Sequence, residues 1–96
     1  MSFPIIDTNV IVRFKVKDNP EHAERARHLL EQVRENKLRL LVPEIVIAEV
    51  VFVLHSPRLS PLDRHAIAEY LLDFIKRKGL LIPQKAVVKR ALELYT

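Results

Sequence analysis

The sequence has 96 residues, of which 49% are hydrophobic and 29% charged, and it predicts one compact domain rather than two. It contains no cysteine, which excludes disulfides, thiolate zinc sites and cysteine nucleophiles, and which fits a reducing cytoplasm. The formal charge of +4 favours acidic partners only mildly. The longest apolar tract, residues 45–54, is too short to span a bilayer, so we expect a cytoplasmic protein without a membrane segment.

Prolines mark the starts of several predicted helices. The first element is a short apolar strand at residues 3–6. Asn19 and Pro20 follow, an N-cap residue and a proline suited to the first helical position, and they predict an amphipathic helix that ends near Asn36. The later predicted elements are a strand at 38–42, a helix at 44–55 opened by Pro43, a helix capped by Ser60-Pro61 with Asp63 in a capping-box position and ended by Gly79, a strand at 80–82, and a last helix opened by Pro83.

Short, wholly apolar strands alternate here with amphipathic helices. This alternation is typical of a parallel sheet that is covered by helices on both faces. The sequence therefore predicts an α/β fold. In such a fold, ligands bind beyond the carboxyl ends of the strands.

Asp7 directly follows the first predicted strand, which places its carboxylate at that edge of the sheet. Thr8 and Asn9 come next and are short polar residues able to orient a carboxylate or a water molecule. The competing interpretation is that Asp7 caps a short helix formed by the residues that follow it. Taken alone, Asp7 fits the capping role better.

Glu49 is the only charged residue between Ile45 and Leu54. A helix of this composition is expected to be buried nearly all round, so its carboxylate needs a hydrogen-bond donor, a cation or a metal. The alternative is a carboxylate that reaches solvent or pairs with a nearby arginine. If Asp7 and Glu49 meet in one crevice, they form a site suited to a hard divalent cation such as Mg²⁺. Two carboxylates carry too little charge to hold two metals unaided.

Residues 5–14 (IIDTNVIVRF), 18–20 (DNP) and 42–54 (VPEIVIAEVVFVL), together with 91–95 (ALELY), resemble the PIN domain, particularly its VapC-type toxin ribonucleases. The resemblance implies a three-layer α/β/α sandwich, an acidic cluster that binds Mg²⁺ or Mn²⁺, cleavage of RNA by a water nucleophile, and inhibition by a cognate antitoxin. By matching motifs, Asp7 is the first acid and Glu49 the second, and Thr8 or Asn9 orients the first.

The resemblance also implies further acids in a segment beyond residue 96. On this reading, residues 1–96 form a single PIN-like domain that is truncated after the third strand and its helix, lacks its C-terminal third, and has an incomplete acidic site. The first strand is central in the family, so residues 3–6 would then form an exposed apolar edge. The alternative function is a non-catalytic binding or dimerisation module. A homodimer is expected because the helices at 44–55 and 62–78 carry more apolar positions than one short sheet can cover.

Several charged residues have two interpretations. Arg13 and Lys15 follow the site and could contact RNA phosphates, or they could simply face solvent. The set His65, Glu69 and Asp73 shares a helical spacing that could bind zinc, although a solvated face is favoured. Asp73 also has the spacing for an exposed ion pair with Lys76 or Arg77. His22 and His28 are six residues apart and are expected on different sides of their helix.

Overall fold

The structure is a computed structural model that describes residues 3–56 and 62–95. Helices predominate in the described residues, and the strands are only two residues long. The elements in chain order are α1 (Thr8–Lys15), α2 (Pro20–Arg34), β1 (Leu40–Leu41), α3 (Glu44–Leu54), α4 (Arg64–Phe74), β2 (Leu80–Leu81) and α5 (Lys85–Tyr95).

The two strands pair in parallel, with Leu40 opposite Leu80 and Leu41 opposite Leu81. On the other side of β1, Ile5 forms a parallel bridge to Leu41, supported by a 2.9 Å hydrogen bond from the Ile6 amide to the Leu41 carbonyl. The predicted parallel sheet and α/β class are therefore confirmed. The strand predicted at residues 3–6 is reduced to this bridge, and it lies at an edge of the described sheet, as expected.

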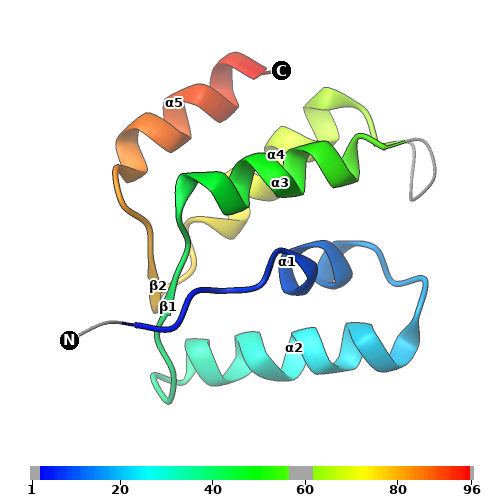
Figure 1. The fold of residues 1–96 in the computed structure, drawn as a ribbon, viewed down its shortest axis with the longest axis vertical. Helices are drawn as coiled ribbons and strands as arrows, with labels where there is room; N and C mark the ends of the chain where they lie inside the picture. Colours follow the sequence, from blue (N-terminus) through cyan, green and yellow to red (C-terminus); the bar gives the residue numbers. More distant parts are fainter. Residues whose placement is uncertain (1–2, 57–61, 96) are drawn as a thin grey trace.

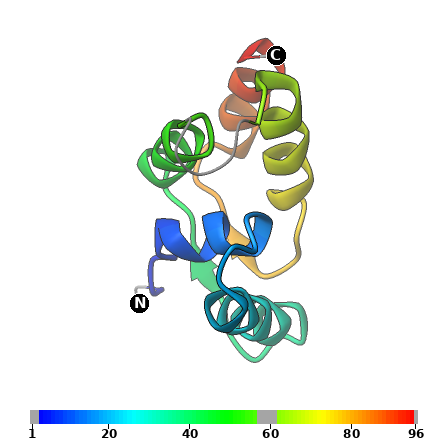
Figure 2. The same cartoon turned by 90° about the vertical axis from the view of Figure 1, so that its right-hand side faces the viewer.

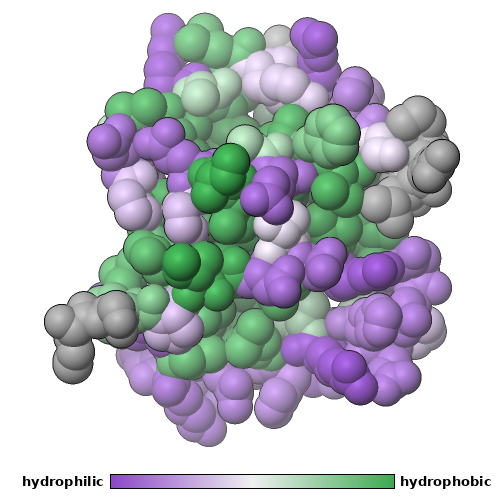
Figure 3. Space-filling view, in the orientation of Figure 1, coloured by the Kyte–Doolittle hydropathy of each residue, from purple (hydrophilic) through white to green (hydrophobic). Residues whose placement is uncertain are grey.

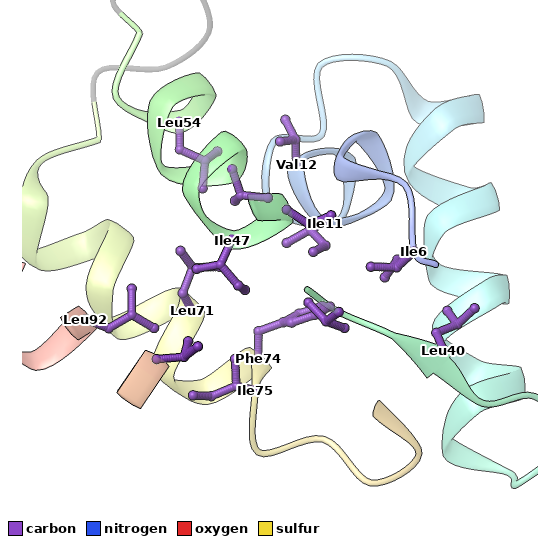
Figure 4. Close-up of a cluster of buried hydrophobic side chains, with 14 of the residues drawn as sticks. Ile6, Ile11, Val12, Leu40, Ile47, Leu54, Leu71, Phe74, Ile75 and Leu92 are labelled. Carbon is purple, nitrogen blue, oxygen red and sulfur yellow. The ribbon is translucent and has the colours of Figure 1, made fainter. Parts of the chain in front are cut away.

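The helices form two groups that contact each other directly, because α1 packs against both α2 and α3. Figures 1 and 2 show α1 and α2 in the lower part of the molecule and α3, α4 and α5 in the upper part. The core joins the two groups, with Ile6 and Ile11 facing Ile47, Leu71 and Phe74 (Figure 4). Among the described residues every buried side chain is hydrophobic, so the acidic residues lie at the surface of the fold.

The helix boundaries follow local chemistry. Asn19 caps α2 by accepting from the amides of Glu21 and His22 at 3.1 Å, with Pro20 at the first position, as predicted. Asp63 is itself the N-cap of α4, because its carboxylate accepts a 2.8 Å hydrogen bond from the Ala66 amide. The capping role assigned to Ser60 and Pro61 lies outside the described residues, while the placement of Asp63 inside the first turn is wrong.

Gly79 adopts the left-handed backbone that its sequence context predicts, with φ of 93°. Its role differs from the prediction, because α4 ends at Phe74 and Gly79 instead leads directly into β2. A Cβ atom at this position would lie 2.7 Å from Val33 Cγ1 and 2.8 Å from the Val33 carbonyl oxygen. Glycine thus allows the chain before β2 to pass against the C-terminal end of α2.

The expectation that the helix at 44–55 is buried nearly all round is wrong. One side of α3 is buried through Val46, Ile47, Val50 and Leu54. The opposite side is exposed, with Ile45 at 64% and Phe52 at 79%. The physical reason is the shortness of the strands, since a sheet two residues long cannot cover more than one face of an eleven-residue helix. Figure 3 shows the resulting hydrophobic surface over α3, above a hydrophilic edge formed by α2.

The predicted ion pair of Asp73 with Lys76 or Arg77 does not form in the described part of the chain. Arg77 instead stacks on two rings, with its guanidinium carbon 4.8 Å from the Phe14 centroid and 5.6 Å from that of Phe74. This stacking joins the end of α1 to the end of α4. Tyr70 adds a second link, because its hydroxyl donates a 2.6 Å hydrogen bond to the Ile11 carbonyl.

Candidate functional site

Asp7 leaves the sheet where the bridge at Ile5 ends and the chain turns into α1. Its backbone is extended, with φ of −76° and ψ of 136°, and its Oδ1 accepts a 2.8 Å hydrogen bond from the Asn9 amide. Asp7 is therefore the N-cap of α1, so the capping interpretation is correct as a structural description. Its exposed carboxylate also lies at the position beyond the strand that a ligand site requires.

Glu49 lies on the exposed side of α3 rather than in the core. The Thr8 hydroxyl, at the first position of α1, donates a 3.1 Å hydrogen bond to Glu49 Oε2. This bond joins residues 41 positions apart in the sequence. Helices α1 and α3 pack against each other. Asp7 directly precedes Thr8, and Thr8 donates to Glu49, so the threonine connects the two acids.

The resemblance predicts that Thr8 or Asn9 orients the first acid. In the structure the backbone N–H of Asn9 donates to Asp7, while the Thr8 hydroxyl donates to the second acid, Glu49. Two carboxylates fixed in this way suit one hard cation that keeps several waters and takes further ligands from a phosphate. Within the described ranges, no group of three or more histidine or acidic side chains is arranged to hold a metal. The described donors therefore do not suffice for a two-metal centre.

The other candidate ligands are not assembled into a site. His65 and Glu69 approach each other, with Nε2 and Oε1 3.3 Å apart, and both side chains are largely exposed. Asp73 completes no metal cluster with them in the described residues. This agrees with the solvated face that the sequence favoured.

The two basic residues that follow the site have protein partners. Arg13 forms a 2.9 Å ion pair with Asp18, and Lys15 lies over the Tyr70 ring, with Nζ 5.5 Å from its centroid. The Arg13–Asp18 ion pair is partly exposed, at 30% and 49%, and a pair of this kind contributes about 0–1 kcal/mol, so Arg13 can exchange Asp18 for another anion at small cost. Arg13 also borders an open pocket between α1 and α2.

This pocket, which the sequence did not predict, has a volume of about 710 Å³. It lies between Asn9, Val10 and Arg13 on α1 and the face of α2 that carries Arg25 and Leu29. Both His22 and His28 border it, although their spacing was expected to separate them. The signal available in the sequence was the set His22, Arg25, Leu29 and Gln32, whose spacing of three, four and three residues marks one helix face.

Comparison with protein families gives a match to the PIN domain over residues 5–96. The chain belongs to the PIN domain family. Membership implies a nuclease-type function and a nucleic acid substrate, and PIN domains are generally dependent on divalent metals. No curated protein and no solved structure gives a significant match to the chain. Across the described residues of this PIN domain, none of the helices combines the length and apolar character needed to cross a membrane.

Proposed function

We propose that this PIN domain is a metal-dependent ribonuclease of the toxin type, acting in the cytoplasm on RNA and restrained by a cognate antitoxin protein. Asp7 and Glu49 would hold one Mg²⁺ or Mn²⁺ ion, and Arg13 and Lys15 would contact the phosphates of the RNA. When bound, such an ion lowers the pKa of a water molecule and polarises a phosphoryl oxygen, which is the chemistry that phosphodiester hydrolysis requires.

The observation that supports this function most directly is the hydrogen bond from Thr8 to Glu49. It ties the acid on α3 to the start of α1, beside the acid at the end of the first strand segment. The Asn9 amide restrains Asp7 in the same way. Both carboxylates are thus oriented by neighbours while remaining open to solvent, as a site that accepts a cation and a polymer substrate must be.

Titration calorimetry with Mn²⁺ tests the metal site. The Asp7→Asn variant removes one charge while keeping a residue that caps helices as well as aspartate does, and Glu49→Gln keeps the size of the side chain. We expect each change to weaken Mn²⁺ binding by at least about tenfold. The matched controls are Asp73→Asn and Glu44→Gln, which remove exposed acids from α4 and α3. Mn²⁺ affinity that is unchanged in Asp7→Asn and Glu49→Gln, or that falls equally in the two controls, would contradict the assignment of the metal site to Asp7 and Glu49.

Cleavage of single-stranded RNA with and without EDTA tests the reaction. Turnover should require the metal and should be lost in both site variants. Cleavage that persists in EDTA, or that survives Asp7→Asn, would exclude the proposed chemistry. Wild-type protein that binds Mn²⁺ and RNA but never cleaves would instead favour the second candidate function.

The second candidate is a non-catalytic binding or dimerisation module, and the apolar surface of α3 and α5 favours dimerisation. Ile45 and Phe52 on α3 are exposed, as are Val87 and Leu94 on α5, at 57% and 68%. A groove of about 320 Å³ lies between the two helices and is bordered by Val51 and Val88, among others. Monomeric proteins rarely expose large contiguous apolar patches, and a second copy of this chain is the occupant we propose for it.

Sedimentation equilibrium tests the dimer. Phe52→Ser should shift the chain toward monomer, whereas Phe3→Ser, which alters an exposed ring on the sheet edge, should leave the association constant unchanged. A monomeric wild-type protein, or a Phe52→Ser variant that associates as tightly as wild type, would refute the interface.

A further inference from the structure

We propose that the pocket between α1 and α2 binds one nucleotide of the RNA strand, next to the phosphodiester held at Asp7 and Glu49. This inference rests on the proposed ribonuclease function and adds a subsite to it. The pocket volume of about 710 Å³ lies within the range of about 300–1,000 Å³ that is usual for small-molecule sites.

The pocket has an apolar base and a polar rim. Val10 on α1 and Ala26 and Leu29 on α2 supply apolar surface for the face of a nucleobase. Planar nitrogen-bearing side chains surround this surface, and they are of the types that stack on bases or bind their edges. They are Asn9, Arg13, His22, Arg25, His28 and Gln32.

The charge of the rim favours an anionic occupant. Among the described residues that border the pocket, Arg13 and Arg25 are cationic and Glu24 is acidic. Arg13 pairs with Asp18 at 2.9 Å, in the partly exposed ion pair noted above. Arg27, outside this pocket, pairs with Glu24 at 2.7 Å and holds the pKa of that carboxyl below its usual value, so the negative charge is already matched. Arg25 pairs with Glu21 at 2.8 Å, but both side chains are more than 70% exposed. Such a pair is weak enough for a phosphate to replace the carboxylate.

The position of the pocket joins it to the candidate site. Asn9 borders the pocket, while its backbone N–H donates a hydrogen bond to the carboxylate of Asp7. Arg13, one helical turn further along α1, borders the same pocket. A strand with a phosphodiester at Asp7 can therefore place the adjacent base between α1 and α2. A peptide helix would use the apolar base of the pocket but would leave most of the amide and imidazole groups without partners, so the RNA strand is the better occupant.

The test measures binding without cleavage. A fluorescently labelled single-stranded RNA of mixed sequence is titrated with the chain in EDTA, and anisotropy gives the Kd. The Arg25→Ala variant is compared with Arg90→Ala, because both arginines are equally exposed and each forms one ion pair with a glutamate on its own helix. We expect Arg25→Ala to weaken binding and to reduce the slope of log K against log salt by about one, and Arg90→Ala to do neither.

The double variant His28→Ala and Gln32→Ala tests the contacts to the base. Neither side chain makes a hydrogen bond recorded within the described residues, so the fold should be kept. Loss of stacking and edge contacts should raise the Kd roughly 5- to 150-fold, and His55→Ala, an exposed histidine on α3's C-cap, should have no effect.

The outcomes separate this inference from the ribonuclease itself. If Asp7→Asn abolishes cleavage while the pocket variants leave both Kd and KM unchanged, the pocket proposal is wrong and the function stands. If wild type never cleaves but RNA binding responds to Arg25→Ala and not to Arg90→Ala, the function fails and the pocket stands. Equal losses in both arginine variants, absence of RNA binding by wild type, or pocket variants that alter only self-association would each overturn the proposal.

Discussion

The Thr8→Val substitution tests whether the hydroxyl of Thr8 positions Glu49. Valine keeps the branched shape of the side chain but cannot donate the 3.1 Å hydrogen bond to Glu49 Oε2. A hydrogen bond of this kind contributes about 0.5–1.5 kcal/mol, and fixing a glutamate side chain costs up to about 2 kcal/mol of rotamer entropy. The lost preorganisation should therefore weaken Mn²⁺ binding by about 2- to 13-fold.

Titration calorimetry with Mn²⁺ on wild type, Thr8→Val and Thr8→Ser provides the measurement, together with a thermal unfolding curve for each. Serine keeps the hydroxyl, so Thr8→Ser should bind Mn²⁺ nearly as well as wild type. The unfolding curves show how much of the change acts on the fold itself, since loss of the bond in Thr8→Val can lower the free energy of unfolding by up to about 1.5 kcal/mol. The reasoning fails if Thr8→Val binds Mn²⁺ like wild type, or if Thr8→Ser loses as much affinity as Thr8→Val.

Two further predictions concern stability. Gly79→Ala forces a positive φ on alanine and places Cβ 2.8 Å from the Val33 carbonyl oxygen, so it should cost about 2–4 kcal/mol and lower the urea midpoint; an unchanged midpoint would contradict the close approach. Burial raises the pKa of Tyr70, so the unfolded chain releases the phenolic proton at a lower pH than the folded chain does. The stability that protonated Tyr70 contributes is therefore complete below about pH 10 and is lost as the pH rises further. From about pH 9 to about pH 11, Tyr70→Phe should therefore lose less stability than wild type. Tyr95→Phe should follow wild type, and equal losses in all three proteins would refute this.

The parts of the fold that local chemistry controls could be predicted from the sequence. The Asn19-Pro20 cap of α2, the helix opened by Pro43 and the positive φ of Gly79 each depend on one or two residues, and all are present. The α/β class followed from the alternation of apolar strands with amphipathic helices. The lengths of the strands did not, since pairing depends on neighbours elsewhere in the chain, and the strand at residues 3–6 is only a bridge at Ile5.

The start of α1 shows a different limit. Residues 8–15 are rich in β-branched side chains, which have a weak preference for helix, so the sequence offered a helix there only as an alternative to a site at Asp7. The structure has both features at once, because an aspartate that caps a helix with one oxygen can still present its carboxylate to solvent. A cap and a ligand are thus not exclusive interpretations of an acid that follows a strand.

The pocket between α1 and α2 could not be predicted because it depends on how two helices pack. The spacing of His22, Arg25 and Gln32 indicates a shared face of α2, but not what that face meets. Only the packing of α1 against α2 brings Asn9 and Arg13 opposite it. Contacts of this kind are set by the core as a whole rather than by any one motif.

Because Glu49 is exposed, its hydrogen bond from Thr8 carries information about function that a buried pair would not carry. A buried carboxylate must be paired because desolvation of its charge costs several kcal/mol, so a partner would then carry no information about function. An exposed carboxylate is solvated and needs no partner for the fold to be stable. The hydrogen bond from Thr8 is therefore not explained by burial, and its plainest physical effect is to restrict the orientation of Glu49 beside Asp7. Thr8→Val should therefore lower the affinity for Mn²⁺, while lowering the free energy of unfolding by no more than about 1.5 kcal/mol.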